Sequence, residues 1–420
     1  MFCAEPGYIL YLYPSQENMG VITGDRLPSL QEWVTGGQRT PEILELQSAG
    51  VLSKVPEIEA AQRARLGELI KETQTCYAPS RSFRGPKLLH LELTSRCPLR
   101  CPQCYNYLSP KQDLPLETIL AHLEEAVQLG VFHIALSGGE PLLYPHLLEV
   151  VRRIAQLGMK STIATSGLGL TERRLTELAN AGLGWVWISL NGSTDAVHSL
   201  SRDGFREAIH AFQLLQQTSM LYGINWVARR DNAHDFPALV ELARQYGVKT
   251  INILRLKPDA GDHENNYLTG SEFMDLGNYL KAYRDQRPSI GVESCFSALR
   301  TFVYGDQLTG ISAGCAAGRS VMAVDVEGKL RPCRHLKYGE SYSSLKEYWF
   351  GSKVLERFRL TEENVQDPCR RCSHHEHCRS CRVSCEQLYG SFYAGEEWCP
   401  LAEKNISSGF AYKGHIGLNT

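Results

Sequence analysis

The sequence predicts an α/β fold with parallel strands, a small α+β segment before it and a cysteine-rich region after it. From about Lys87 to about Arg284, short apolar strands alternate with amphipathic helices in six successive strand–helix units. This alternation implies a parallel sheet with right-handed crossovers. Eight of the 14 cysteines lie between Cys315 and Cys399, which marks off the C-terminal region.

Each element of the central region follows from its hydrophobic period. Leu116, Ile119 and Leu123 fall on one helical face, whereas Leu89, Leu91 and Leu93 alternate as in a strand. The predicted strands cover residues 89–93, 131–136, 160–165, 184–189, 223–229 and 249–255, and the predicted helices residues 116–127, 146–157, 171–181, 205–217, 236–246 and 271–284. Six such units suit an open doubly wound sheet or an incomplete barrel, and both bind ligands at the carboxyl ends of the strands.

Composition excludes several function classes. A chain of 420 residues is expected to form two or three domains. The net charge of −2 offers no electrostatic case for nucleic-acid binding. No apolar run is long enough to span a bilayer and no signal-peptide pattern begins the chain, so we expect a cytoplasmic protein without membrane contact. Cysteines in that compartment indicate metal ligands or redox groups rather than disulfides.

Three cysteines follow the first strand of the central region with the spacing Cys97-x3-Cys101-x2-Cys104. A zinc knuckle or a redox dithiol could use such thiols. A [4Fe–4S] cluster needs four ligands, so three thiolates would leave one iron free to bind a small molecule.

A glycine-rich turn follows the second strand and reads Ser137-Gly138-Gly139-Glu140-Pro141. Glycines at this place let the backbone approach a ligand closely, and Glu140 offers a carboxylate to a cation. Such a turn is unremarkable alone, but it directly follows the strand next to the cysteine loop.

Together the two motifs resemble the signature of the radical S-adenosylmethionine (radical SAM) enzymes. The resemblance implies a partial (β/α)6 TIM-like barrel and a [4Fe–4S] cluster on Cys97, Cys101 and Cys104 that binds S-adenosylmethionine. It also implies reductive cleavage of that cofactor to a 5′-deoxyadenosyl radical. The cofactor's ammonium group would bind at the Gly-Gly-Glu turn. The cofactor-binding residues expected from these motifs are Tyr105, Gly138, Gly139 and Glu140.

Three further residues match the family at later strand ends. Ser166 and Ser189 close the third and fourth strands, where relatives carry similar polar turns. Arg202 follows the fourth strand and could bind the cofactor carboxylate bidentately, although a solvated surface charge is the competing interpretation. Asn191 stands where many relatives have aspartate, so the contact at that turn is left open.

The C-terminal cysteines resemble the SPASM extension of the same enzymes. By the family pattern an outer auxiliary cluster takes Cys369, Cys372, Cys378 and Cys399, and an inner one takes Cys315, Cys333, Cys381 and Cys385. Eight thiolates suit two [4Fe–4S] clusters, or one [4Fe–4S] and one [2Fe–2S]. Two structural zinc sites are the alternative. The lone cysteines, Cys3, Cys76 and Cys295, receive no role, and His374, His375 and His377 are expected to be surface residues.

The expected domains are an N-terminal segment (1–83), a radical SAM barrel (84–300), a SPASM domain (301–405) and a tail (406–420). The N-terminal segment, with strands near 7–13 and 21–23 and a helix capped at Thr40, has two interpretations. It is either a structural cap or a module that resembles the winged-helix leader-peptide-binding domains of peptide-modifying relatives.

The leading functional hypothesis is a radical SAM enzyme that modifies a ribosomally made precursor peptide, with a flavodoxin or ferredoxin as reductant. The cysteine spacing resembles that of the enzymes that crosslink the pyrroloquinoline-quinone precursor. Arg334 follows Cys333 where sulfatase maturases carry a catalytic aspartate, which argues against that activity. Tetrapyrrole tailoring and a zinc-stapled binding protein are the alternatives. No acid or base residue is assigned.

Overall fold

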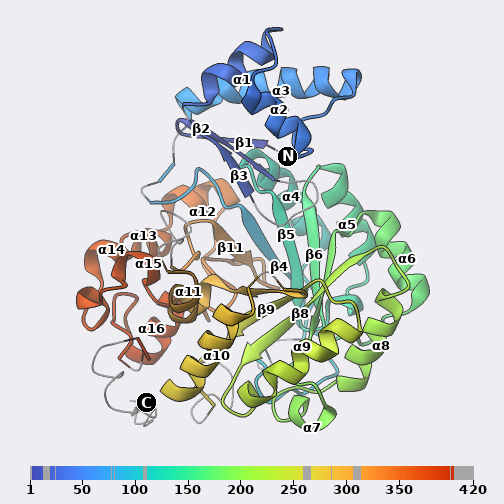
Figure 1. The fold of residues 1–420 in the computed structure, drawn as a ribbon, viewed down its shortest axis with the longest axis vertical. Coiled ribbons are helices and arrows are strands. Elements are labelled where there is room, and N and C mark those ends of the chain that lie inside the picture. Colours follow the sequence, from blue (N-terminus) through green and yellow to red (C-terminus); the bar gives the residue numbers. More distant parts are fainter. Residues whose placement is uncertain are drawn as a thin grey trace.

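The computed structural model describes most of the chain (Figure 1). The described residues are 2–12, 19–23, 25–76, 78–79, 81–106, 111–258, 266–284, 286–305, 314–397 and 399–401. The expected tail at 406–420 lies outside them. No helix among the described residues has both the length and the apolar character that crossing a membrane requires.

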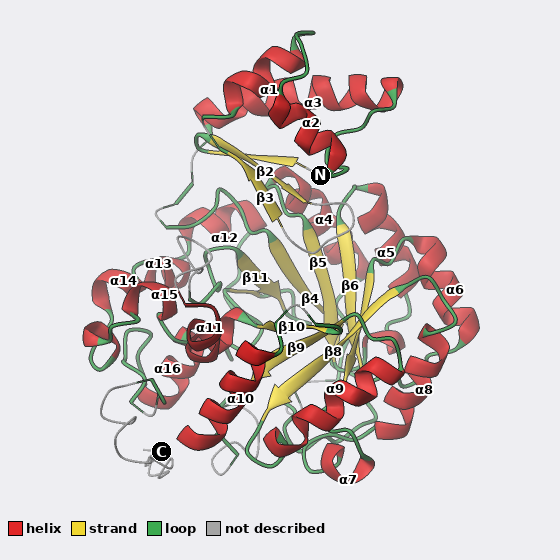
Figure 2. Cartoon of the chain, in the orientation of Figure 1, coloured by secondary structure: helices red, strands yellow, loops and turns green. Residues whose placement is uncertain are grey.

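A parallel sheet forms the centre of the molecule, with helices packed around it (Figure 2). Its six consecutive parallel strands are β4 (Leu88–Thr94), β5 (His133–Gly138), β6 (Lys160–Thr165), β7 (Trp185–Ser189), β8 (Leu221–Ala228) and β9 (Thr250–Arg255). They lie in sequence order, as successive right-handed crossovers require. All six strands predicted from the hydrophobic pattern are confirmed.

The crossover helices also match the predicted segments. They are α4 (Leu116–Gln128), α5 (Leu147–Gln156), α6 (Glu172–Ala181), α8 (Phe205–Leu215), α9 (Phe236–Gln245) and α10 (Gly270–Ala282). Thr269 closes a capping box with Glu272 at the start of α10, and Gly182 ends α6 in a left-handed conformation. Their apolar faces and the sheet share one continuous core.

The sheet extends beyond the six predicted units at both edges. β10 (Ser289–Val292) adds in parallel to β9, and α11 (Ser297–Tyr304) follows it. On the other side β11 (Val321–Val324) pairs in parallel with β4, and β12 (Leu330–Arg331) pairs antiparallel with β11. Because β10 and β12 form the edges of the sheet, the barrel is partial rather than closed. The C-terminal region therefore begins as part of the barrel sheet.

The remaining C-terminal residues form short helices around the cysteines. These are α12 (Leu345–Gly351), α13 (Lys353–Arg359), α14 (Thr361–Asn364), α15 (His375–Cys378) and α16 (Arg382–Tyr389). Trp349 is fully buried, and its indole N–H donates to the Phe83 carbonyl at 3.1 Å. That bond ties α12 to the segment that leads into the barrel.

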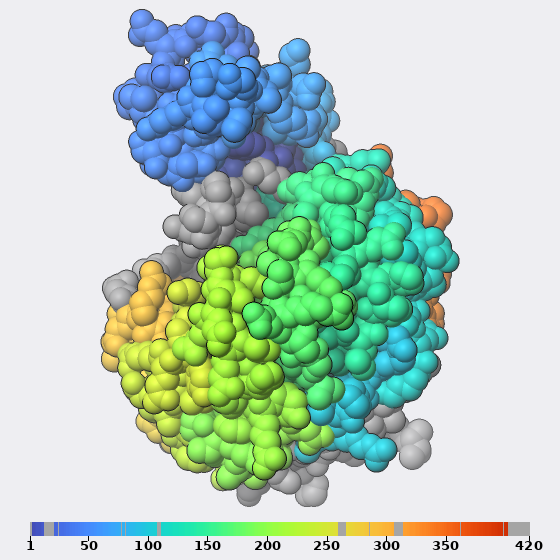
Figure 3. Space-filling model, turned by 90° about the vertical axis from the view of Figure 1, so that its right-hand side faces the viewer, coloured from blue at the N-terminus to red at the C-terminus, as the bar shows by residue number. Residues whose placement is uncertain are grey.

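The N-terminal residues form a separate lobe with its own apolar core (Figure 3). Three antiparallel strands, β1 (Phe2–Glu5), β2 (Tyr8–Leu12) and β3 (Met19–Ile22), precede three helices, α1 (Leu27–Val34), α2 (Pro41–Ser48) and α3 (Pro56–Thr75). Thr40 occupies the predicted N-cap of α2, although its side chain makes no capping bond. The sequence interpretation predicted neither β1 nor α1. It also missed the 20-residue helix α3, whose largely charged and polar residues give little hydrophobic period.

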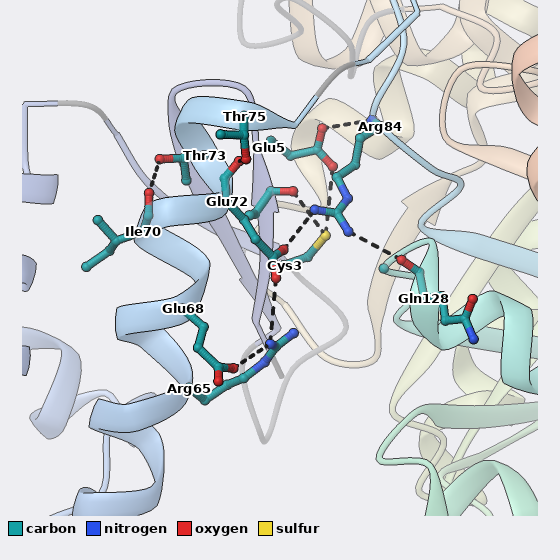
Figure 4. Close-up of polar contacts among 12 residues, drawn as sticks. Cys3, Glu5, Arg65, Glu68, Ile70, Glu72, Thr73, Thr75, Arg84 and Gln128 are labelled. Carbon is teal, nitrogen blue, oxygen red and sulfur yellow. Dashed lines mark hydrogen bonds and ion pairs between the residues drawn. The ribbon is translucent and has the colours of Figure 1, made fainter.

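This lobe docks at the amino ends of the barrel strands. Lys87, directly before β4, forms a buried ion pair with Glu5 of β1, with Nζ and Oε1 2.7 Å apart. The Glu5 carboxylate also accepts the Arg84 N–H at 2.8 Å (Figure 4). Cys3 and Phe132 belong to one small apolar cluster across the same junction. The lobe therefore lies at the end of the barrel opposite the carboxyl-end loops.

We predict that Glu5→Gln destabilises the protein by about 3 kcal/mol, because it leaves the buried Lys87 ammonium without its counter-ion. Urea denaturation of the purified chain measures the loss. Glu68→Gln is the matched control, since the Arg65–Glu68 pair is more than half exposed and should change stability by about 1 kcal/mol or less. Equal losses in the two variants would contradict the prediction.

One carboxyl group lies inside the barrel without a strong partner. Glu92 of β4 is 3% exposed, and its Oε1 atom has no hydrogen-bond partner among the described residues. Burial raises the pKa of Glu92 to about 7, partly offset by Arg331 and Arg334. The folded state thus binds a proton that the unfolded state releases near pH 4.5. Stability contributed by this group is lost as the pH rises toward 7.

Glu92→Gln should therefore stabilise the protein at pH 8 by about 3 kcal/mol at most and change little at pH 5. The neutral amide avoids the cost of a buried carboxylate while keeping its shape. Denaturation midpoints at the two pH values test this. A variant that is equally affected at both pH values would refute the assignment.

Candidate functional site

A cavity of about 910 Å³ opens at the carboxyl ends of the strands. Every cofactor-binding residue expected from the sequence lines it, together with the three N-terminal motif cysteines. These are Cys97, Cys101, Cys104, Tyr105, Gly138, Gly139, Glu140, Ser166, Ser189 and Arg202. These ten residues come from four successive strand ends, those of β4 to β7, which meet in one space because parallel strands present their carboxyl ends on the same side.

The loop after β4 is held by the turn that follows β7. The Arg100 N–H donates to Oδ2 of Asp203 at 2.7 Å, and the Asp203 N–H donates to the Cys101 sulfur at 3.4 Å. The Gln103 N–H donates to the Ser201 carbonyl at 3.3 Å. The sequence interpretation missed Asp203 and Ser201. Only folding brings them beside cysteines about a hundred positions away.

The two glycines of the Gly-Gly-Glu turn allow a close approach between neighbouring loops. The Gly139 N–H donates to the Thr94 carbonyl at 2.6 Å, and the Glu140 N–H donates to the Arg96 carbonyl at 2.9 Å. A Cβ atom at Gly138 would lie 2.1 Å from the Thr94 oxygen, and one at Gly139 would lie 2.4 Å from the Arg96 oxygen. The close approach of the loop after β4 is therefore enough to require glycine at both positions, whether or not a ligand binds there.

The Glu140 carboxylate is fixed by the end of β6. Oε1 accepts the Thr165 hydroxyl at 2.6 Å, while Oε2 accepts the Ser166 hydroxyl at 2.6 Å and the Ser166 N–H at 2.9 Å. Oε1 also accepts the Leu142 N–H at 3.2 Å. With Glu140 only 1% exposed, these donors hold a carboxylate at the cavity wall. Ser166 therefore positions Glu140, whether or not it also contacts a ligand.

The turn after β7 is rigid because its polar groups satisfy one another. Asn191 is fully buried, and its amide donates to Ser201 Oγ at 2.8 Å and accepts the Val227 N–H at 3.0 Å. His198 Nδ1 accepts the Asn191 N–H, so its Nε2 carries the proton and faces the Asp203 carbonyl at 3.2 Å. Burial lowers the pKa of His198 to about 4, which keeps the ring neutral. Asn191 is thus a structural residue of this turn.

Arg202 extends from the same turn to the cavity, and its buried Nε atom has no hydrogen-bond partner in the described part of the chain. The Ser137 hydroxyl at the end of β5 also lines the cavity and is likewise unpaired. Buried polar groups are normally satisfied, so these two donors fit a bound polar molecule.

The C-terminal region supplies the far wall of the cavity. Arg334 and His335 follow Cys333, and the His335 ring lies 4.6 Å from the Tyr105 ring, centroid to centroid. Lys257 and Glu293 follow β9 and β10 and also line the cavity. The sequence interpretation missed these residues, although the rule that functional groups follow strand ends would have indicated Lys257 and Glu293.

Four C-terminal thiols surround a second, much smaller cavity. Its lining includes the complete set expected for the outer auxiliary cluster, namely Cys369, Cys372, Cys378 and Cys399. Burial raises the pKa of Cys378 to about 12, so this thiol is protonated unless a cation binds it. His374 and His375 line the same cavity and are half-buried, which differs from the surface location expected for them. Residues 375–378 form the short helix α15, which carries Cys378.

The remaining C-terminal thiols form an inner group nearer the main cavity. Cys315, Cys333 and Cys381 pack in one apolar cluster, and Cys315 and Cys381 share a side-chain hydrogen bond. Cys295, to which the sequence assigned no role, packs against the same cluster. Cys385 is fully buried one turn along α16 from Cys381, with its sulfur accepting an Arg382 N–H at 3.3 Å.

The donor sets fit iron–sulfur clusters. Within the described part of the chain, no three His, Cys, Asp or Glu side chains converge as a single metal ion would require. That is no obstacle to a cluster, because its thiolates bind different irons and stand farther apart. Buried cations near the thiols, including Lys257 and Arg382, would offset the negative charge of a thiolate-bound cluster.

Comparison with known families gives a consistent result. Residues 91–243 match the Radical SAM superfamily, and residues 315–373 match SPASM, an iron–sulfur cluster-binding domain. Radical SAM domains bind a [4Fe–4S] cluster with S-adenosylmethionine, and SPASM domains bind auxiliary iron–sulfur clusters. The second match leaves the zinc alternative for the C-terminal thiols without support.

Individual relatives agree with these domains. The chain is 28% identical over 335 residues to the PqqA peptide cyclase of Methylorubrum extorquens strain PA1, covering 76% of this chain and 86% of that relative. Streptococcus suis SuiB, also crystallised with its precursor peptide SuiA, has a similar fold, with a TM-score of 0.72 at 17% identity over 95% of this chain and 98% of SuiB. For anSMEcpe with bound AdoMet the TM-score is 0.61 at 18% identity, over 76% of this chain and 95% of that one.

We predict that Asp203→Ala lowers the rate of S-adenosylmethionine cleavage about tenfold, because the Cys101 loop loses a charge-assisted hydrogen bond. The product is quantified by chromatography after anaerobic reduction, with iron content measured in parallel. Asp195→Ala is the control, because within the described ranges that carboxylate accepts a hydrogen bond from the nearby Ser199 and makes none to the cysteine loop. Equal cleavage rates in the two variants would show that the hydrogen bond between Arg100 and Asp203 does not affect the reaction.

Proposed function

We propose that this chain, which joins a radical SAM domain to a SPASM domain, is an enzyme that modifies a ribosomally made precursor peptide. The observation that carries the proposal is the single cavity shared by the cysteine loop, the Gly-Gly-Glu turn and the C-terminal residues Arg334 and His335. The relationship to PqqA peptide cyclases supports a peptide substrate. Tetrapyrrole tailoring has no comparable support.

Different residues of the chain would bind the cluster, bind S-adenosylmethionine and orient the peptide. Cys97, Cys101 and Cys104 would hold the cluster. Glu140 would bind the ammonium of S-adenosylmethionine and Arg202 its carboxylate, since all five line the same cavity. When bound there, the cluster and S-adenosylmethionine would supply a 5′-deoxyadenosyl radical, which can remove a hydrogen atom from a peptide. The buried walls of the cavity exclude water and orient the substrate.

The outer auxiliary cluster would use Cys369, Cys372, Cys378 and Cys399, which gather around one cavity. The inner cluster would lie at Cys315, Cys333 and Cys381. We further propose that a flavodoxin or ferredoxin supplies electrons and that the enzyme works in the cytoplasm, where free thiols persist.

The N-terminal lobe would bind part of the precursor peptide at a distance from the chemistry. The lobe is anchored at the amino end of β4, where Glu5 forms an ion pair with Lys87. The cysteine loop follows the carboxyl end of the same strand. A seven-residue strand separates the two ends by about 23 Å. A peptide held by the lobe must therefore extend along the barrel before its target residue reaches the cavity.

The test is anaerobic incubation of the reconstituted enzyme with S-adenosylmethionine, a reductant and synthetic candidate precursor peptides chosen from short reading frames near its gene. We expect 5′-deoxyadenosine and a peptide whose mass has changed, for a crosslink by the loss of two hydrogens. The variant Cys97→Ala/Cys101→Ala/Cys104→Ala should form neither product, because it lacks the loop thiols. An unchanged peptide together with a modified tetrapyrrole would overturn the substrate assignment.

A further inference from the structure

Cys295 lies at the carboxyl end of a barrel strand, beside the inner thiols. It follows β10 in the short helix η3 (Ser294–Phe296) and packs against the cluster that contains Cys315, Cys333 and Cys381. Cys315 follows Cys295 by 20 positions, a spacing that belongs to neither of the cysteine motifs in the sequence. The parallel pairing of β10 with β9 brings Cys295 to this place.

The inner thiols lie around one buried ammonium group, that of Lys257. The Lys257 side chain is 5% exposed, and its Nζ lies 3.5 Å from the Cys381 sulfur. The same ammonium interacts electrostatically with Cys295, Cys333 and Glu293. A buried ammonium requires negative partners, and thiolates around it would provide them.

Cys385 has different surroundings. Its sulfur accepts a hydrogen bond from a guanidinium N–H of Arg382 at 3.3 Å and lies 3.8 Å from the Ser380 hydroxyl. It is not among the residues of the apolar cluster that holds Cys315, Cys333, Cys381 and Cys295. Cys385 therefore lies outside the group that the other four thiols form.

We propose that Cys295 is the fourth thiolate of the inner auxiliary cluster, with Cys315, Cys333 and Cys381, and that Cys385 is not a ligand. This assignment rests on the proposed function, in which these thiols bind iron and sulfide. When Cys295 binds iron, an Fe–S bond forms and the thiol proton leaves. Glu293 accepts it, because the Cys295 sulfur already donates to Oε2 at 2.8 Å.

The assignment places the inner cluster at the wall of the main cavity. Glu293, which contacts Cys295, and Lys257, which contacts Cys381, both line that cavity. A cluster held by these thiols would be adjacent to the bound peptide. The positive Lys257 would stabilise its reduced, more negative state.

The test uses the full chain carrying Cys97→Ala/Cys101→Ala/Cys104→Ala, so that the auxiliary clusters alone are observed. After anaerobic reconstitution, Cys295→Ser and Cys385→Ser are compared by iron and sulfide content and by electron paramagnetic resonance. Cys295→Ser should lose the iron of one cluster or change its spectrum, whereas Cys385→Ser should match the parent. Cys385→Ser losing iron while Cys295→Ser matches the parent would overturn the proposal.

A second variant separates ligation from simple packing. In Cys295→His the imidazole can replace the thiolate, and histidine ligation raises the reduction potential of an iron–sulfur cluster. We expect one auxiliary potential to rise in a folded protein that retains iron. Unchanged potentials in Cys295→His would overturn the assignment of Cys295. A parent without any iron at the C-terminal thiols would instead refute the proposed function.

Discussion

Pairing of β4 on both of its sides is the constraint on which the rest of the structure depends. β5 adds the Gly-Gly-Glu turn on one side, and β11 adds the C-terminal region on the other. Lys87, at the amino end of β4, anchors the N-terminal lobe through Glu5. The cysteine loop leaves the carboxyl end of the same strand. A single strand therefore sets the relative positions of all three parts of the chain.

Around that strand the site is organised by contacts within the protein. The Gly138 and Gly139 backbone lies so close to the β4 loop that no side chain could fit between them. Asp203 holds the loop from the other side, and Thr165 and Ser166 fix the Glu140 carboxylate. Such preorganisation reduces the ordering cost of binding a cofactor and a flexible peptide.

Charge distribution links the barrel to the C-terminal thiols. Arg255, at the end of β9, forms a buried ion pair with Glu396, whose N–H donates to the Cys369 sulfur at 3.3 Å. Lys257, two residues later, faces the inner thiols. Arg255 is thus balanced by Glu396, and thiolates that bind iron would bring further negative charge close to Lys257.

The sequence by itself determined the six strand–helix units, the cysteine loop, the Gly-Gly-Glu turn and the membership of the outer thiol group, because each depends on local period or spacing. Only the tertiary structure decided that β11 extends the barrel sheet, that Asp203 holds the cysteine loop and that Cys295 joins the inner thiols. These are contacts between residues distant in the chain. The geometry of strand pairing sets them, and no local pattern of residues encodes it.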